Sequence, residues 1–321
     1  MKAQLFDEIS TDLTQVEAGL LRVVSAQAQT LTNIGTHLLK AGGKRLRPAL
    51  FLLVAKTHEY DFARMMPVAV ALELIHMATL VHDDVIDEAQ TRRGYITANT
   101  KWGNLTAVLA GDFLFAQAFA SIAHYADPRI FGALSQLVSC MCEGEIIQIA
   151  NTYNINQTEG DYLARIQKKT ADFISGACEL GSYMSGAPDT VVQALRDYGH
   201  CLGMAFQITD DILDIVADEV QIGKPAGNDL KQGIMTLPII YALHNSPDKD
   251  VLRGIIEKRE LRAEDVALGL EIIRATDAVE YSYGLVNRYI QRSKERITVV
   301  GDPALRDSFS RIADFVGQRT Y

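Results

Sequence analysis

Apolar residues recur every three or four positions along most of this chain, the spacing that gathers them on one face of an α-helix. Apolar–polar alternation, which is typical of a half-buried strand, is nearly absent. The first predicted helix is long and amphipathic, from residue 5 to residue 39, with a break near residues 27–33. The other predicted helices cover residues 105–125, 128–150, 159–185, 189–217 and 236–243, with two or three more in 263–320.

Prolines and glycines predict where several of these helices begin. A proline has no N–H to donate and needs none in the first helical turn, so Arg47-Pro48 predicts one helix start and Pro67 predicts the next. Gly42-Gly43 predicts a hinge just before the first of these helices. The polar and basic stretch over residues 91–99 predicts a loop.

Composition supports a single helical domain. Of the 321 residues 48% are hydrophobic and only 8 are proline, so the chain can bury a large helical core. The predicted loops are short, and no linker rich in Pro, Gly or Ser divides the chain. We therefore expect one all-α domain over residues 1–321, a single large helical bundle.

Charge and hydropathy narrow the possible partners and location. The net charge of −9 argues against nucleic acid as the main partner. No unbroken apolar run approaches the roughly 18 residues that cross a bilayer, so we expect no membrane span. Residues 1–24 carry acidic side chains among apolar ones, which is unlike a targeting signal. We expect a cytoplasmic protein whose four cysteines, Cys140, Cys142, Cys178 and Cys201, are reduced.

Two acidic segments carry the candidate chemistry. Asp83-Asp84-x-x-Asp87 and Asp210-Asp211-x-x-Asp214 each follow an apolar stretch with helical spacing. Residues four apart share a helix face, so each segment projects two like charges the same way, at a cost in free energy. Hard divalent cations would neutralise that charge, and Mg²⁺ favours oxygen ligands shared with phosphates.

Cations are placed around these acidic segments. Gly42-Gly43-Lys44-Arg45-Leu46-Arg47-Pro48 combines two glycines with three cations just before a helix, and backbone and cations of this kind bind anions. Arg92-Arg93 follows the first acidic segment and Lys224 follows the second, while Lys168-Lys169-Thr170 lies in an apolar stretch. The pattern suggests a pair of diphosphates, held partly by metal and partly by direct cations.

These motifs occur in the order found in one family. Gly43-Lys44-Arg45-Leu46-Arg47-Pro48, the first acidic segment with Arg92-Arg93, Gly144-Glu145-x-x-Gln148, Lys169-Thr170, and Gln207 with the second acidic segment and Gly223-Lys224-Pro225 resemble those of trans-isoprenyl diphosphate synthases. The resemblance runs from residue 42 to residue 241 and more weakly to the end. Within the family the chain is most similar to the catalytic component of bacterial heptaprenyl diphosphate synthase. The resemblance implies the isoprenoid synthase fold, helices around a central active-site cavity.

The resemblance also implies a role for each motif residue. Asp83, Asp87 and Asp210 would hold about three Mg²⁺ ions on an allylic diphosphate, with Asp84, Asp211 and Asp214 as direct or water-mediated supports. Arg92, Lys169 and Lys224 would contact the same diphosphate, and Lys44, Arg47, His76 and Arg93 would bind isopentenyl diphosphate. Thr170 and Gln207 would face the developing allylic cation. For His76 the alternative is a hydrogen-bonded core histidine.

One position departs from the family pattern. Many relatives have a lysine in a Gly-Lys-x-Thr segment, where this chain has Gly233-Ile234-Met235-Thr236. A diphosphate contact is therefore missing, and Lys231 is a candidate to replace it.

The length of the product depends on the helix that ends in the first acidic segment. One helical turn rises about 5.4 Å, close to the length of one isoprene unit. Ala78 and Thr79, one turn before Asp83, are both small, so we expect an open tunnel gated there. This predicts a medium or long all-trans product, grown from farnesyl or geranylgeranyl diphosphate.

Other functions remain open on sequence alone. A geranylgeranyl or farnesyl diphosphate synthase would share the motifs, and a terpene cyclase on the same fold would share the acidic segment but not need a second diphosphate site. A non-catalytic partner subunit is expected to have lost the acidic segments, which this chain keeps. The family usually dimerises, so we expect a homodimer, or a heterodimer with a small non-catalytic subunit.

Overall fold

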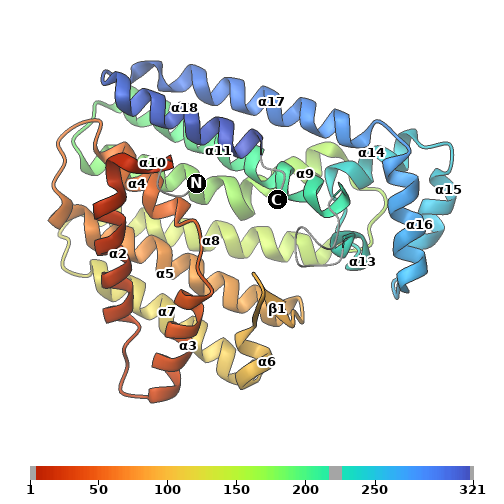
Figure 1. Cartoon of the computed structure of the whole chain (residues 1–321), viewed down its shortest axis with the longest axis horizontal. Helices are drawn as coiled ribbons and strands as arrows, with labels where there is room; N and C mark the ends of the chain where they lie inside the picture. Colours follow the sequence, from red (N-terminus) through yellow and green to blue (C-terminus); the bar gives the residue numbers. More distant parts are fainter. Residues whose placement is uncertain (1–4, 217–225, 319–321) are drawn as a thin grey trace. The chain divides into compact units, whose positions relative to one another are not determined.

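The computed structural model describes residues 5–216 and 226–318 of the chain, and nearly all of them are helical (Figure 1). The chain forms two compact units. The first consists of Met1–Val138, Gly176–Leu195 and Val300–Ser308, and the second of Ser139–Ser175, Arg196–Val299 and Phe309–Tyr321. The expectation of a single domain stays a prediction, because each unit is assembled from segments that alternate along the chain.

The first unit contains the N-terminal elements and a short hairpin. Its elements are η1 (Asp7–Ile9), α2 (Ser10–Val23), α3 (Gln29–Lys40), α4 (Leu46–Ala55), α5 (Phe62–Ile86), β1 (Thr91–Arg92), β2 (Tyr95–Ile96), α6 (Ala98–Trp102) and α7 (Asn104–Ile122). The second unit contains α9 (Glu159–Ile166), η2 (Gln167–Ala171), α13 (Asn228–Lys231), α14 (Leu237–Asn245), α15 (Lys249–Glu257), α16 (Ala263–Arg274), α17 (Ala278–Arg296) and η3 (Ile297–Val299). Four unit boundaries fall inside α8 (Pro128–Ala150), α10 (Asp172–Met184), α11 (Asp189–Val216) and α18 (Pro303–Gly317), and a fifth follows η3.

Helix α5 forms the core of the first unit. It packs along α7 and against α4 and α2, as Figure 1 shows for these labelled helices. Its residues from Val68 to Ile75 are all buried and, apart from Glu73, all apolar, so this part of the helix has no polar face. A helix of this kind is stable only inside other elements. The acidic segment at its C-terminal end is therefore held by a rigid, buried element.

The core of the second unit is built on α14. This helix packs against α15, α16 and α17, and Leu237, Ile239 and Leu243 on it are buried. Pro238 stands at the start of the helix, where its missing N–H costs little. The apolar pattern at residues 236–243 therefore predicted this core helix to within two residues at its C-terminal end.

Most helices predicted from periodicity are confirmed, with three corrections. Helix α5 begins at Phe62 and not at Pro67, because the Asp61 side chain caps its start by accepting a hydrogen bond from the Ala63 N–H at 3.0 Å. The predicted loop over residues 91–99 holds the hairpin of β1 and β2 and the start of α6. Helices α13 and α15 were not predicted.

Three helices are long and apolar enough to be candidate membrane spans, so the expectation of no membrane span stays a prediction. By length and composition alone, Phe62–Ile86, Asn104–Ile122 and Pro128–Ala150 qualify. Each helix contains isolated polar residues. They interrupt the run of apolar residues but hardly lower the mean hydropathy. In α5 the apolar window is 67% buried inside the protein, which accounts for its composition without a membrane.

Candidate active site

The first acidic segment occupies the last turn of α5, in the first unit. Asp83 and Asp87 are partly exposed and lie four residues apart, so their carboxylates share a helix face. Asp84 is buried and accepts a hydrogen bond from Arg92 Nε on β1 at 2.7 Å. This ion pair fixes the Arg92 side chain beside the acidic segment. The structure brings Asp83, Asp84, Asp87 and Arg92 together as the sequence predicted.

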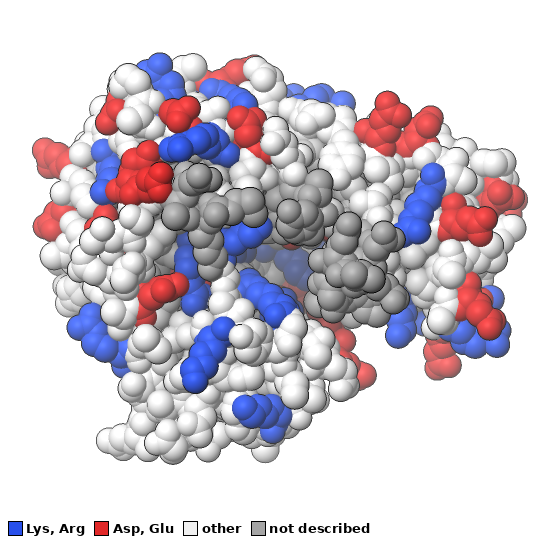
Figure 2. Space-filling model, viewed as in Figure 1, with Lys and Arg blue, Asp and Glu red and all other residues white. Residues whose placement is uncertain are grey.

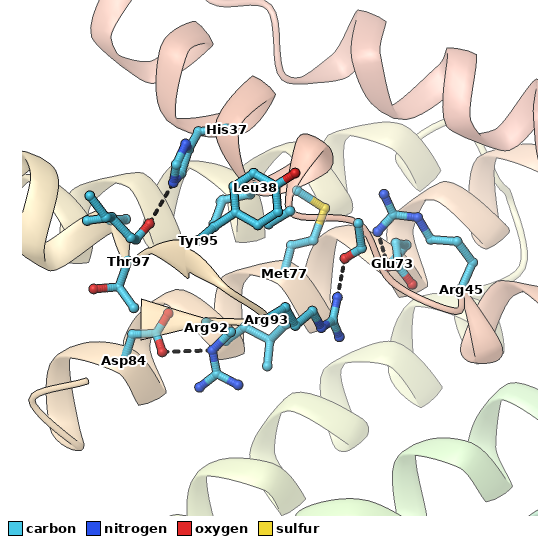
Figure 3. A pocket seen from close by; sticks show the side chains of 15 residues that line it. His37, Leu38, Arg45, Glu73, Met77, Asp84, Arg92, Arg93, Tyr95 and Thr97 are labelled. Carbon is cyan, nitrogen blue, oxygen red and sulfur yellow. Dashed lines mark hydrogen bonds and ion pairs between the residues drawn. The ribbon is translucent and has the colours of Figure 1, made fainter. Parts of the chain in front are cut away.

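A small cavity in the first unit lies behind the hairpin arginines (Figure 3). It has a volume of about 40 Å³, room for a water molecule and far too little for a prenyl chain. Met77 and Leu80 of α5 line it, together with Arg93, whose Nη1 donates a hydrogen bond to the Gly42 carbonyl. The bond joins the hairpin to the glycine loop, two segments that the sequence analysis treated as separate anion-binding candidates.

The glycine loop is fixed by a buried ion pair that the sequence analysis did not identify. Arg45 has a left-handed backbone conformation, with φ of 49°, directly before α4. Its Nη1 lies 2.7 Å from Glu73 Oε1, and both residues are buried. Lys44 is exposed and Arg47 is partly exposed on either side of it. In the sequence, this pair could have been recognised from Glu73, a single carboxylate in the otherwise apolar middle of α5.

His76 lies on α5 one turn after Glu73 and is mostly buried. Burial lowers its pKa well below the usual value, and the positive charges of Arg47, Arg93, Arg92 and Arg45 lower it further. The imidazole is therefore neutral at neutral pH and can donate one hydrogen bond without adding charge. Two of these arginines, Arg47 and Arg93, are among the residues that the resemblance implies for isopentenyl diphosphate, and that role stays a prediction.

The two expected gate residues differ in their environment. Thr79 lies four residues before Asp83, so both are on the same face of α5. Thr79 is partly exposed, and its hydroxyl donates to the His76 carbonyl at 2.8 Å. Ala78 lies a further 100° around the helix and is fully buried. Thr79 is therefore the better placed of the two to limit a chain that begins at Asp83.

The second acidic segment lies on α11, in the second unit. Asp210 is partly exposed, whereas Asp211 is buried. Asp211 Oδ2 accepts a hydrogen bond from the Tyr162 hydroxyl at 2.7 Å, and Oδ1 accepts one from Gln207 Nε2 at 2.8 Å. Burial raises the pKa of Asp211 to about 6, although the hydrogen bonds from Gln207 and Tyr162 act to lower it.

The last aspartate of this segment anchors the chain that follows it. Asp214 Oδ1 accepts from the Asn228 N–H at 3.1 Å, and Oδ2 accepts from the Asp229 N–H at 3.0 Å. Asp214 thereby satisfies two N–H groups at the start of α13. The sequence analysis did not identify Asp229 as part of this site. Burial raises the pKa of Asp229 well above the usual value, and the negative charges of Asp214 and Asp211 raise it further. The sequence feature that could have identified Asp229 is an acidic residue directly after Gly227-Asn228.

Lys169 and Thr170 lie in η2, a π-helical stretch between α9 and α10. Lys169 Nζ lies 2.5 Å from Glu145 Oε2 on α8, and the Thr170 hydroxyl donates to Gln207 Oε1 at 2.7 Å. Local π-helical turns occur frequently at functional sites because they turn side chains out of regular register. The structure thus joins Thr170 and Gln207 by a direct hydrogen bond that the sequence analysis did not predict.

Two glycines allow other helices to approach η2 closely. A Cβ at Gly144 would lie 2.9 Å from the Lys169 backbone nitrogen, and one at Gly203 would lie 2.6 Å from the Ala171 Cα. Any larger residue would therefore displace the backbone that carries Lys169 and Thr170. This explains the glycine of the Gly144-Glu145 motif in physical terms.

Two predictions concern residues that follow α11 in the sequence. Lys224 lies outside the described residues. Lys231, the candidate replacement for the lysine missing at Ile234, ends α13, and its carbonyl accepts from the Tyr153 hydroxyl at 3.3 Å. Its role in diphosphate binding stays a prediction.

Comparison with known proteins gives the same assignment as the motifs. Residues 28–273 match the polyprenyl synthetase family. The chain is 42% identical to heptaprenyl diphosphate synthase component 2 of Geobacillus stearothermophilus, over 99% of this chain and 98% of that protein. It is 32% identical to the octaprenyl diphosphate synthase of Escherichia coli, over 99% of both chains.

Solved structures agree on the fold. A decaprenyl diphosphate synthase from Rhodobacter capsulatus superposes with a TM-score of 0.93 at 33% identity, covering 100% of both chains. The heptaprenyl diphosphate synthase of Staphylococcus aureus gives 0.92 at 34% identity, covering 98% of this chain and 99% of that one. The all-helical isoprenoid synthase fold expected from the sequence is confirmed. This chain is a prenyltransferase and belongs to the polyprenyl synthetase family.

Proposed function

We propose that this protein is a trans-polyprenyl diphosphate synthase that adds isopentenyl diphosphate units to an allylic diphosphate. The observation that carries the proposal is the hydrogen-bonded Thr170–Gln207 pair, with Lys169 in the same π-helical stretch and Asp210 one turn further along α11. In such a site, the oxygen dipoles can stabilise a carbocation, and the charged groups can stabilise a leaving diphosphate. The relatives named above elongate prenyl chains of medium and long length.

Magnesium fits the carboxylates of both acidic segments. Asp83 with Asp87, and Asp210 in the second unit, offer only oxygen ligands on partly exposed faces. Among the described residues no group of three or more His, Cys, Asp or Glu side chains could hold a metal alone. That is the expected arrangement for Mg²⁺, which binds one or two protein carboxylates and completes its coordination with substrate phosphates and water. When bound, Mg²⁺ neutralises the diphosphate as its charge grows.

The side chains then have the following roles. Arg92, Lys169 and Lys224 contact the allylic diphosphate, and Lys44, Arg47, His76 and Arg93 bind the diphosphate of the second substrate. The allylic C–O bond breaks, and its electron pair leaves with the diphosphate. Thr170 and Gln207 direct oxygen lone pairs at the allylic cation until the isopentenyl double bond attacks it. Loss of one proton to the departed diphosphate completes the step, so no side-chain nucleophile is required.

The partner and the location of the protein are part of the proposal. We infer a dimer, either of two copies or of this chain with a small non-catalytic subunit, because the bacterial relatives are named as one component of a synthase. Exposed Leu105, Val108 and Leu109 on α7 supply an apolar face for a partner. Acidic and basic side chains are interspersed on the face drawn in Figure 2, which together with the charge of −9 supports a cytoplasmic protein without nucleic acid or membrane span.

One assay tests the proposal. The purified chain is incubated with farnesyl diphosphate, isopentenyl diphosphate and Mg²⁺, and the products are identified by mass. Products that grow in steps of one isoprene unit, and that vanish when Mg²⁺ is chelated, support it. A cyclised hydrocarbon contradicts it in favour of a terpene cyclase. Elongation that requires an added small subunit identifies the heterodimer.

A further inference from the structure

Tyr162 on α9 is fully buried, and no motif of the sequence analysis included it. Its hydroxyl begins a line of three hydrogen bonds within the second unit. Tyr162 donates to Asp211, Gln207 donates to the other oxygen of Asp211, and Thr170 donates to Gln207. The three donor–acceptor distances are 2.7, 2.8 and 2.7 Å.

The chemistry of the groups fixes the direction of every bond in this line. A carboxylate can only accept, so the amide nitrogen of Gln207 must face Asp211. The amide oxygen of Gln207 then faces Thr170, and the Thr170 hydroxyl must donate its proton to it. The lone pairs of the Thr170 oxygen are consequently left for the developing allylic cation.

The two oxygens of Asp211 have different partners, since Oδ2 accepts from Tyr162 and Oδ1 accepts from Gln207. Hydrogen bonds to a charged carboxylate are stronger than those between neutral groups, so both partners help to hold Asp211 in place. If Asp211 loses the Tyr162 donor, its carboxylate can rotate away from Gln207. Without the Tyr162 hydroxyl, the Gln207 amide is no longer held in one of its two orientations. The reversed amide would donate to Thr170 and occupy one of its lone pairs.

We propose that Tyr162 is a positioning residue for the reaction, and that Asp211 serves to orient Gln207 and Thr170 toward the allylic cation instead of binding metal. The inference rests on the proposed function. It assigns different tasks to the neighbours Asp210 and Asp211: the partly exposed Asp210 binds Mg²⁺, and the buried Asp211 directs the oxygen dipoles.

The first test is Tyr162→Phe in the full chain, with Tyr198→Phe as the matched control. Tyr198 is another fully buried tyrosine of the second unit, and its hydroxyl donates a hydrogen bond to the Phe309 carbonyl at 2.9 Å. We expect Tyr162→Phe to lower kcat by about tenfold or more, with KM for both substrates unchanged, because the contact acts in the transition state. Both variants lose one buried hydrogen bond and should lower Tm to a similar extent. Tyr198→Phe should leave kcat unchanged.

The second test is the isosteric Asp211→Asn, read through its metal dependence. A positioning role predicts a lower kcat with an unchanged Mg²⁺ concentration for half-maximal rate. A rise in that Mg²⁺ concentration with little change of kcat at saturating metal overturns the proposal, because it identifies Asp211 as a metal ligand. An unchanged kcat in Tyr162→Phe overturns it as well.

A binding experiment separates this inference from the proposed function. An ammonium analogue of the allylic cation, added with pyrophosphate and Mg²⁺, is compared by calorimetry with a neutral alkyl diphosphate. Tyr162→Phe should weaken only the ammonium analogue, by about tenfold. Equal affinities in the variant and the wild type contradict the positioning role. A wild-type protein that binds no alkyl diphosphate contradicts the proposed function itself.

Discussion

Burial decides the charge state of several side chains in the candidate site. Asp211 and Asp229 are carboxylates with raised pKa values, and His76 is an imidazole with a lowered one, in each case because burial is the largest cause. All three shifts favour the neutral form. A pKa of about 6 still leaves Asp211 mostly ionised at neutral pH, so its two oxygens accept hydrogen bonds from Tyr162 and Gln207.

The lowered pKa of His76 predicts part of the acid sensitivity of the fold. Below about pH 6.5 the unfolded chain protonates this histidine while the folded chain does not, so the free energy of unfolding falls as pH decreases. Above that pH the imidazole is neutral in both states and contributes no pH dependence. His76→Gln should remove a slope of about 1.4 kcal/mol per pH unit below pH 6.5.

Urea unfolding at pH 7.5 and pH 5.5 measures this slope. The raised pKa of Asp211 acts in the opposite direction over part of this range, so the wild type and the variant are compared at each pH. Parallel stability curves for the two proteins would contradict the prediction.

At the scale of elements, close packing around η2 positions the side chains of Lys169 and Thr170, for which we propose a role in the reaction. The π-helical stretch fits between α8 and α11 only because Gly144 and Gly203 have no side chain. Sequence periodicity predicted one continuous helix over residues 159–185, and the chain is indeed helical from Glu159 to Met184. The change of hydrogen-bond pattern at Gln167–Ala171 could not be predicted, since it results from packing by distant segments.

Gly203→Ala should displace η2 and lower both stability and activity. The added methyl would lie 2.6 Å from the Ala171 Cα, a clash with backbone that cannot move aside cheaply. Overpacking of this kind costs about 1–3 kcal/mol of unfolding free energy, and displacement of Thr170 should lower kcat. Thermal unfolding and steady-state kinetics measure the two effects.

Gly254→Ala is the matched control. Gly254 is a glycine of helix α15, and no atom of the described residues outside its own stretch of helix lies within 4 Å of the position that a methyl group would take. Alanine should therefore stabilise the helix by about 0.5–1 kcal/mol. A Gly203→Ala protein as stable and active as this control would show that η2 tolerates displacement.

Helix α5 is also the element on which product length should depend. Thr79→Phe places a ring one turn before Asp83 on the same face, and we expect it to shorten the product by one or more isoprene units. Ala78→Phe should shorten it too, but Ala78 is fully buried, so this variant should also lose about 1–3 kcal/mol of stability. Product masses test both, and an unchanged length distribution in both variants would contradict a gate at this level.

At the scale of the whole molecule, the two acidic segments belong to different compact units. Asp83 is in the first and Asp210 in the second, although the proposed reaction needs both on one diphosphate. The proposed binding of one diphosphate by both residues predicts energetic coupling between them.

A double-mutant cycle measures that coupling. Asp83→Ala and Asp210→Ala should each lower kcat strongly, and the double variant should lose much less than the product of the two factors, because residues that act as a unit are non-additive. Asp83→Ala combined with Asp265→Ala is the control. Asp265 lies in α16 and pairs with Lys258. The two substitutions should therefore act independently, so the fold-loss of kcat in the double variant should equal the product of the two single losses. Multiplicative effects in both pairs would contradict a shared diphosphate.

The sequence by itself determined the helical class, the start and end of most helices, and the identity of the charged residues, because apolar spacing, capping residues and acidic spacing are local properties. The family resemblance named Thr170 and Gln207, but their hydrogen bond to each other was found only in the structure. The tertiary structure alone decided the partners of these residues: Tyr162 on Asp211, Glu73 on Arg45, Asp229 beside Asp214, and the π-helical turn at Thr170. Burial and close approach between segments distant in the chain produce these features, and no local pattern records which segments will meet.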